Sequence, residues 1–229
     1  EVSAADESSS SVADSLLMLS SSMMSSDQEL SSAVATRGLI AYWPFNGNST
    51  NEVAGVVAGT EEGSVEYTAG AVGQALTLNS YDERVTTPVN SADFKLQEFT
   101  VSAWFKLDRL NDNQEIYNLH DSRPGVRRGV SVFVGSDNRP RFAMATNNGG
   151  VWSEIISNTR IESGLWYFIA CSYDGSVQKM IINGNNVEER VENSAILYSD
   201  VPPTIGASRS EYIATARYFG GSIDEVKVY

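Results

Sequence analysis

The chain has 229 residues, which is enough for one large domain or two small ones. Its 16 basic and 29 acidic residues give a formal net charge of -13, and this field repels phosphate backbones, which argues against a nucleic-acid partner. No stretch approaches the ~18 consecutive apolar residues that a membrane-spanning helix needs. Because Cys171 is the only cysteine and His120 the only histidine, an internal disulfide and a Cys/His zinc site are excluded.

Residues 1–36 differ in composition from the rest of the chain. They contain 13 Ser and six acidic residues, but no Lys, Arg or aromatic residue. This composition is typical of a disordered segment, so we expect an acidic, Ser-rich linker over residues 1–36 and a folded domain over residues 37–229. A second interpretation is that Leu16, Leu19 and Met23, which recur at helical spacing, belong to a short amphipathic helix that docks on the domain or on a partner.

From Gly38 onward, short runs of alternating apolar, β-branched and aromatic residues are separated by Gly, Asn and Asp. The runs span residues 39–45, 75–78, 99–107, 129–134, 141–145, 165–173, 179–182 and 222–229. Asp174-Gly175 and Asn183-Gly184 are typical of hairpin turns that flank a strand. Many short strands without a long helical pattern predict an all-β, two-sheet antiparallel jelly-roll sandwich.

Six segments carry a more specific pattern. They read GLIAYWPFNGN at 38–48, GQALTL at 73–78, FTVSAWFK at 99–106, GLWYFIACSYDG at 164–175, IING at 181–184 and FGGSIDEVKVY at 219–229. In this order they resemble the laminin G-like domains of the concanavalin A-like lectin/glucanase superfamily. The resemblance covers residues 38–229 and implies the same jelly-roll fold.

The resemblance also implies a structural calcium ion. Such domains commonly hold one where the two ends of the domain lie side by side, with the closing Asp and oxygens of the opening loop as ligands. In this sequence those positions are Asp224, Asn46, Gly47 and Asn48, with Glu52 as a further candidate, and all offer the oxygen ligands that Ca²⁺ prefers. The alternative is that Asn46-Gly47 is only a turn and Asp224 only a loop-capping acid.

Sugar binding in such folds relies on aromatic faces that stack on sugar rings. Trp43, Trp104 and Trp166 lie in segments that match the family pattern, so we interpret them as core or framework. Trp152 follows a glycine-rich stretch that does not match, and this favours a role as a ligand platform. The alternative is that Trp152 packs beneath its own loop.

Positive charge is concentrated in one part of the chain. Five of the 12 Arg fall within residues 123–141, just after His120. Guanidinium groups bind carboxylate and sulfate bidentately, which favours an anionic polysaccharide such as a uronate or a sulfated glycan. The alternative is that these Arg pair with the protein's own acids. The residues predicted to contact the ligand are Trp152, Arg123, Arg127, Arg128, Tyr117, His120, Arg209 and Tyr212.

We predict no catalytic residue. The Glu-x-Asp-x-x-Glu pattern of many retaining glycosidases is absent. Tyr117, His120 and Arg123 are of the types that a polysaccharide lyase uses, but they lie in no motif of that kind. The leading hypothesis is a non-catalytic carbohydrate-binding module of a larger, secreted, polysaccharide-active or adhesive protein. The alternatives are a protein-binding adhesion domain and a lyase or hydrolase with an unrecognised site.

Overall fold

The computed structural model describes residues 38–53, 55–87, 91–121, 128–147, 152–208 and 217–229. Residues 40–229 form one compact unit. The linker predicted for residues 1–36, with its alternative helix, lies outside the described residues. No helix in the described ranges is long and apolar enough to cross a membrane.

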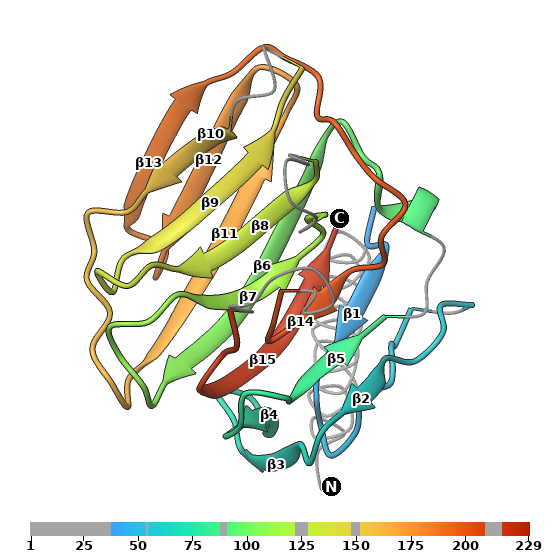
Figure 1. Ribbon diagram of the computed structural model, residues 1–229, viewed down its shortest axis with the longest axis vertical. Coiled ribbons are helices and arrows are strands. Elements are labelled where there is room, and N and C mark those ends of the chain that lie inside the picture. Colours follow the sequence, from blue (N-terminus) through green and yellow to red (C-terminus); the bar gives the residue numbers. More distant parts are fainter. Residues whose placement is uncertain (1–37, 54, 88–90, 122–127, 148–151, 209–216) are drawn as a thin grey trace, which may run out of the picture. The chain divides into compact units, whose positions relative to one another are not determined.

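Two antiparallel β-sheets make up the domain, one in front of the other in Figure 1. The first contains, in spatial order, β13 (Asn186–Val191), β12 (Val177–Ile182), β11 (Trp166–Tyr173), β6 (Phe99–Leu107), β15 (Gly221–Val228), β4 (Gln74–Leu78) and β3 (Glu66–Ala69), while β1 (Ala41–Trp43) also pairs with β15. The second contains β10 (Trp152–Ile156), β9 (Pro140–Ala145), β8 (Val130–Val134), β7 (Gln114–Asn118), β14 (Thr204–Ile205), β5 (Arg84–Thr86) and β2 (Thr60–Glu62). A single turn of 3-10 helix spans Ser91–Phe94. The all-β, two-sheet prediction is confirmed.

The hydrophobic core lies between the two sheets. Along β6, Val101, Ala103 and Phe105 are buried in it, whereas Trp104 is on the opposite face and only half-buried. This alternation arises because successive strand residues point to opposite faces of a sheet. Cys171 is a free thiol in the same core, and its burial raises its pKa well above the ordinary value.

The two predicted hairpin turns connect β11 to β12 and β12 to β13. Asn183 and Gly184 have φ angles of 51° and 73°, and Gly175 has a φ of 86°. Positive φ at these positions matches the twist of the flanking strands, which is why Asn-Gly and Asp-Gly are favoured there. The turns therefore fix the register of three adjacent strands.

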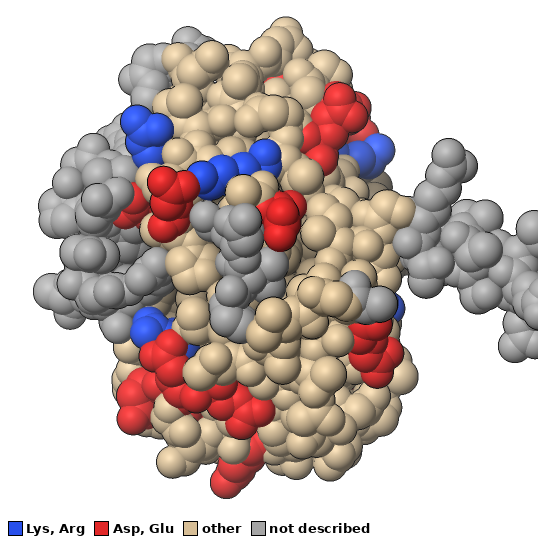
Figure 2. All heavy atoms as spheres, turned by 90° about the vertical axis from the view of Figure 1, so that its right-hand side faces the viewer, with Lys and Arg blue, Asp and Glu red and all other residues tan. Residues whose placement is uncertain are grey.

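Charge is unevenly distributed over the surface. On the face turned to the viewer in Figure 2, acidic side chains gather in the lower part, at the height of β2 and β3 in Figure 1, while acidic and basic side chains lie together in the upper part. Residues 37–229 contain all 16 basic residues and 23 of the 29 acidic ones, a net charge of -7. Residues 37–229 are thus less acidic than the whole chain.

One buried polar side chain joins the sheets across the core. Gln178 of β12 is fully buried; its Nε2 donates to the Phe142 carbonyl of β9 at 2.8 Å, and its Oε1 accepts from the Ser153 hydroxyl of β10 at 2.9 Å. Both partners belong to the opposite sheet. The amide therefore fixes how the two sheets sit on one another near their β10–β12 edges.

Replacing Gln178 by Ala should lower the free energy of unfolding by ~2–4 kcal/mol, because it removes both inter-sheet hydrogen bonds of the buried amide and opens a cavity. Denaturant titration followed by fluorescence measures the change. Lys179→Ala is the matched control on the same strand: it removes only the surface ion pair with Glu189 and should cost ~0–1 kcal/mol. Equal losses in the two variants would contradict the inter-sheet role of Gln178.

Candidate functional site

The outer face of the seven-stranded sheet carries a row of small and polar side chains. The register places Thr204, Asn118, Ser131, Ala143 and Glu154 opposite one another on β14, β7, β8, β9 and β10. Their strand neighbours, such as Val132 and Phe142, belong to the core, so the row points away from it. Most of this row is nevertheless buried, and only Glu154 among its members is partly exposed.

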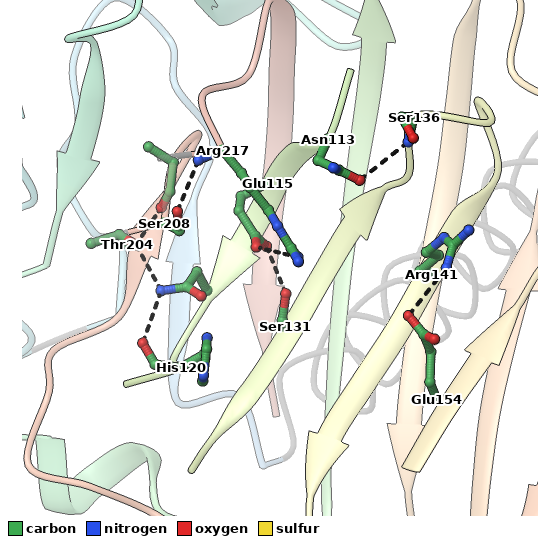
Figure 3. Close-up of polar contacts among 12 residues, drawn as sticks. Asn113, Glu115, His120, Ser131, Ser136, Arg141, Glu154, Thr204, Ser208 and Arg217 are labelled. Carbon is green, nitrogen blue, oxygen red and sulfur yellow. Dashed lines mark hydrogen bonds and ion pairs between the residues drawn. The ribbon is translucent and has the colours of Figure 1, made fainter. Parts of the chain in front are cut away.

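Glu115 is the most deeply buried carboxylate on this face, with 1% of its surface exposed. Its Oε2 accepts a hydrogen bond from the Ser131 hydroxyl at 2.7 Å, and its Oε1 is 3.2 Å from Nη1 of Arg217 (Figure 3). Burial raises the pKa of Glu115, while the Arg217 charge and the Ser131 hydroxyl oppose that rise. The Arg217 side chain remains 39% exposed and lies over the Phe133 ring, with its Cζ 4.4 Å from the ring centroid. Glu115 thus orients a guanidinium group that solvent can reach.

An aromatic pair flanks the row on the side away from Arg217. The rings of His120 and Trp152 are 4.7 Å apart between centroids, at an interplanar angle of 76°. His120 follows β7 and Trp152 is the first residue of β10, and both are half-buried. The fold therefore brings together two of the predicted ligand contacts from segments about thirty residues apart in the sequence.

Asn118 lies between these two groups of side chains. It is fully buried, and its Nδ2 donates to the Thr204 hydroxyl and to the His120 carbonyl, both at 3.4 Å. Its Oδ1 is buried and has no hydrogen-bond partner in the part of the chain that the structure describes. Since buried polar atoms are nearly always paired, we expect this oxygen to accept a hydrogen bond from an internal water molecule.

The remaining predicted ligand contacts are distributed differently. Tyr117 is 2% exposed and packs in the core, so its ring offers almost no surface to a ligand. Arg128 is exposed and donates from Nη1 to the Tyr198 carbonyl at 3.3 Å. Four further predicted contacts lie outside the described residues, namely Arg123, Arg127, Arg209 and Tyr212.

Part of the predicted arginine cluster is paired within the protein. Arg141 is 3.0 Å from the Asp137 carboxylate and 3.5 Å from that of Glu154, at the end of the polar row (Figure 3). Burial acts to raise the pKa of Asp137, but hydrogen bonds from Arg141 and Arg139, with the Arg141 charge, outweigh it and lower that pKa. For Arg141 the structure thus agrees with the alternative interpretation, in which Arg pairs with the protein's own acids. Arg217, which the sequence analysis did not single out, is a partly exposed cation on this face.

The predicted calcium residues lie around the turn between β3 and β4. Asp224 is fully buried; its Oδ2 accepts from the Val72 backbone N–H at 2.9 Å, and its Oδ1 is buried without a hydrogen-bond partner among the described residues. Gly70 packs so closely that a Cβ there would be 2.6 Å from Oδ2. Burial, together with the charge of Glu225, raises the pKa of Asp224 against the opposing Val72 hydrogen bond. A buried carboxylate oxygen without a partner fits a cation ligand.

The opening loop reaches the other end of the same turn. The Asn46 Oδ1 accepts from the Gln74 N–H at 2.9 Å, and the Asn48 Oδ1 accepts from the Thr50 N–H at 2.8 Å. Because a carbonyl oxygen has two lone pairs, each still has acceptor capacity for a cation. Gly47 lies between them and is exposed. No group of three or more His, Cys, Asp or Glu side chains within the described ranges is arranged to hold a metal. A cation here would rest on one carboxylate and neutral oxygens, which fits Ca²⁺ better than a softer metal.

The tryptophans predicted to form the framework fall into two groups. Trp43 is fully buried in the core, as predicted. Trp104 and Trp166 instead lie on the outer face of the eight-stranded sheet, half-buried beside Phe168. Their match to the family pattern did not distinguish the core face of a strand from its solvent face.

The fold and the sequence together define the family. Residues 79–229 match the model Laminin_G_3, described as the concanavalin A-like lectin/glucanases superfamily. The chain belongs to this family, as its motifs predicted. A comparison with curated proteins gives no match.

Several solved structures share the fold at low sequence identity. Domain 4 of AbnA, a GH43 extracellular arabinanase from Geobacillus stearothermophilus, in complex with arabinotriose, has a TM-score of 0.66 and 20% identity over 83% of this chain and 91% of that chain. The Ruminococcus gnavus IT-sialidase CBM40 bound to α2,3 sialyllactose has a TM-score of 0.54 and 17% identity, over 75% and 88%. A botulinum neurotoxin type C structure, described as interacting with two ganglioside molecules, has a TM-score of 0.62 and 16% identity, over 86% and 49%.

Replacing Glu115 by Gln should change how stability depends on pH. A carboxyl whose pKa is raised by folding contributes stability at low pH, and this contribution is lost as pH rises above its ordinary value near 4.5. The wild type should therefore lose stability relative to Glu115→Gln as pH rises from about 4 to 8. Thermal melting of both proteins across this range measures the difference. If the wild type instead gained stability relative to Glu115→Gln as pH rises, the effect of Arg217 and Ser131 on the pKa of Glu115 would outweigh the effect of burial.

Proposed function

We propose that this domain is a non-catalytic carbohydrate-binding module of a secreted polysaccharide-active or adhesive protein. Its binding face is the outer surface of the seven-stranded sheet between the His120–Trp152 pair and Arg217. The observation that carries the proposal is the half-buried His120–Trp152 aromatic pair on the same face as the solvent-accessible guanidinium of Arg217. Sugars are recognised by this combination, in which aromatic faces contact the ring and polar groups bind its hydroxyls.

Solved structures of the same fold support this class of ligand. The arabinanase domain was solved with arabinotriose and the sialidase module with sialyllactose, two unrelated sugars. Because identity to both is low, the likeness supports carbohydrate as the ligand class and leaves the particular glycan to the side chains of this chain.

The state of Glu115 supports binding rather than catalysis. A glycosidase acid or nucleophile must reach its substrate, and a retaining enzyme needs a second carboxyl ~5–5.5 Å away. Glu115 is 1% exposed and already engaged by Ser131 and Arg217. Its role in this proposal is to hold Arg217 in position.

The cations near this face support an anionic glycan, a uronate or a sulfated sugar. Arg217 and Arg128 both retain accessible surface, and the folded part of the chain carries only a moderate net charge. The guanidinium fork matches carboxylate and sulfate oxygens in pairs.

We also propose a structural Ca²⁺ held by Asp224, with oxygens of Asn46, Gly47 and Asn48. The Oδ1 of Asp224, unpartnered within the described ranges, supports it. The ion would offset the cost of burying this carboxylate and would tie the closing strand to the opening loop.

Affinity electrophoresis against neutral, uronate and sulfated polysaccharides tests the binding face. The wild type should be retarded by at least one acidic polysaccharide, and Trp152→Ala should weaken binding about tenfold, ~1.4 kcal/mol, by removing the ring contact. Ile156→Ala is the matched control, since Ile156 is exposed on the same strand and face, and it should bind like the wild type. Absence of retardation with every polysaccharide would overturn the carbohydrate proposal. Retardation that Trp152→Ala leaves unchanged would overturn this location.

Thermal melting with CaCl₂ and with EGTA tests the metal. At a Ca²⁺ concentration about 100-fold above Kd, the ion should add ~2.7 kcal/mol and raise Tm by ~5–10 °C. In Asp224→Asn this shift should disappear, because the amide oxygen is a weaker ligand than the carboxylate. Glu52→Gln, at the further candidate ligand, should keep most of it. Equal melting temperatures of the wild type in the two buffers would overturn the calcium proposal.

A further inference from the structure

The outer face of the eight-stranded sheet carries an aromatic groove that is separate from the site above. Trp104 of β6 lies opposite Phe168 of β11, and Trp166 lies two residues before Phe168 on the same face. Phe105 and Tyr167, the intervening residues, are buried in the core. The three aromatic side chains therefore point away from the core, on the side of the sandwich opposite to His120 and Trp152.

These rings form the walls of an open groove of about 470 Å³ that Asn183 and Gly184 complete. The Trp104 and Phe168 rings are 5.4 Å apart between centroids and inclined at 57°. Lys106 lies over Trp166, with Nζ 5.3 Å from the ring centroid. The volume falls within the ~300–1,000 Å³ typical of small-molecule sites, and it suits one or two sugar rings.

The rim of the groove offers hydrogen-bond donors. The Asn183 Oδ1 accepts from the Phe168 backbone N–H at 2.8 Å, which turns the amide's acceptor inward. The exposed Nδ2 forms no hydrogen bond within the described ranges and remains a donor toward solvent. Lys106 adds a second donor, a cation. Aromatic walls with N–H donors beside them match a sugar ring, whose C–H face is apolar and whose edge carries hydroxyl or carboxylate oxygens.

The size of the patch argues against a protein partner. Trp104, Trp166 and Phe168 are each only half-buried, so only part of each ring is accessible, and their neighbours on the same face include Lys106 and Ser172. A stable protein interface buries ~800 Å² per partner and has an extended apolar centre. Three partly exposed rings with a polar surround suit a ligand of a few rings.

We propose that this groove is a second glycan-binding site, so that one domain holds two sugar segments on opposite faces. The proposal rests on the proposed function for the class of ligand, but its residues are independent of the first site. Two sites on one domain allow a single molecule to bridge two polysaccharide chains or to bind one chain twice, which raises the apparent affinity through avidity.

Calorimetric titration of the full chain with trigalacturonate and with maltotriose tests the proposal. At least one of these sugars should give a stoichiometry of two per chain. Trp166→Ala and Gly184→Asn should each remove one of the two sites or weaken it at least tenfold. Gly184 has a φ of 73°, and a Cβ at this position would meet no other atom within 4 Å. Asn tolerates this backbone, so it adds a side chain at the rim without disturbing the core. Val187→Ala, exposed on β13 and outside the groove, is the control and should retain both sites.

The outcomes separate this proposal from the first. If the titration detects one site, and Trp152→Ala removes it while Trp166→Ala and Gly184→Asn do not, the second site is overturned and the first is kept. If the titration detects one site, and Trp166→Ala and Gly184→Asn remove it while Trp152→Ala does not, the groove is kept and the location of the first site is overturned. Binding of neither sugar overturns the groove as a glycan site. A dimer in sedimentation that Gly184→Asn converts to a monomer would show that a second copy of the chain occupies the groove, and it would also overturn the proposal.

Discussion

The hydrogen-bonded pairing of β15 is the constraint on which the rest of the domain depends. Along one edge, β15 pairs with β6; along the other it pairs with β4 through residues 221–223 and with β1 through residues 226–228. It therefore connects the strands from the start of the domain to the centre of the sheet. Among the described strands, only β15 joins β1 and β4 to β6.

The change of partner from β4 to β1 explains the unusual chemistry at this point. The register with β6 shifts between Asp224 and Lys227, and Glu225 has a φ of 53°. A bulge of this kind re-aims side chains that a regular strand would place differently. It leaves the Asp224 carboxylate buried against the turn at Gly70 instead of in solvent. The same irregularity that lets one strand serve two partners thus creates the part of the closing motif that suits a cation.

The sequence predicted those strands in which one face is apolar and the turns are marked. Residues 99–107 are a strand with the predicted bounds, and the hairpins at Asp174-Gly175 and Asn183-Gly184 are where the pattern placed them. The edge strands β2 and β13 escaped prediction, because their exposed, Glu-rich sequences bury too little to show an alternation. The predicted strands and turns were enough to give the fold class.

The candidate site was harder to predict, for reasons of geometry. On β7 the bulge between Glu115 and Tyr117 breaks the period of two, and polar residues occupy the outer face, so QEIYN does not look like a strand. Trp152 and His120 were both named from the sequence, yet their contact depends on the β7–β8–β9–β10 order, which no local pattern contains. Arg217 was missed for the same reason, since its partner Glu115 is 102 residues away.

The central place of β15 also governs how the domain can form during synthesis. The pairing of Ala41 with Val228 joins the first and last strands of the domain, so neither sheet edge at β4 or β6 is covered until residues 221–228 have left the ribosome. Folding is then a late, non-local event, and sandwiches with such distant contacts fold in milliseconds to seconds rather than microseconds. During that interval the unpaired edges of β4 and β6 are templates for association with other chains.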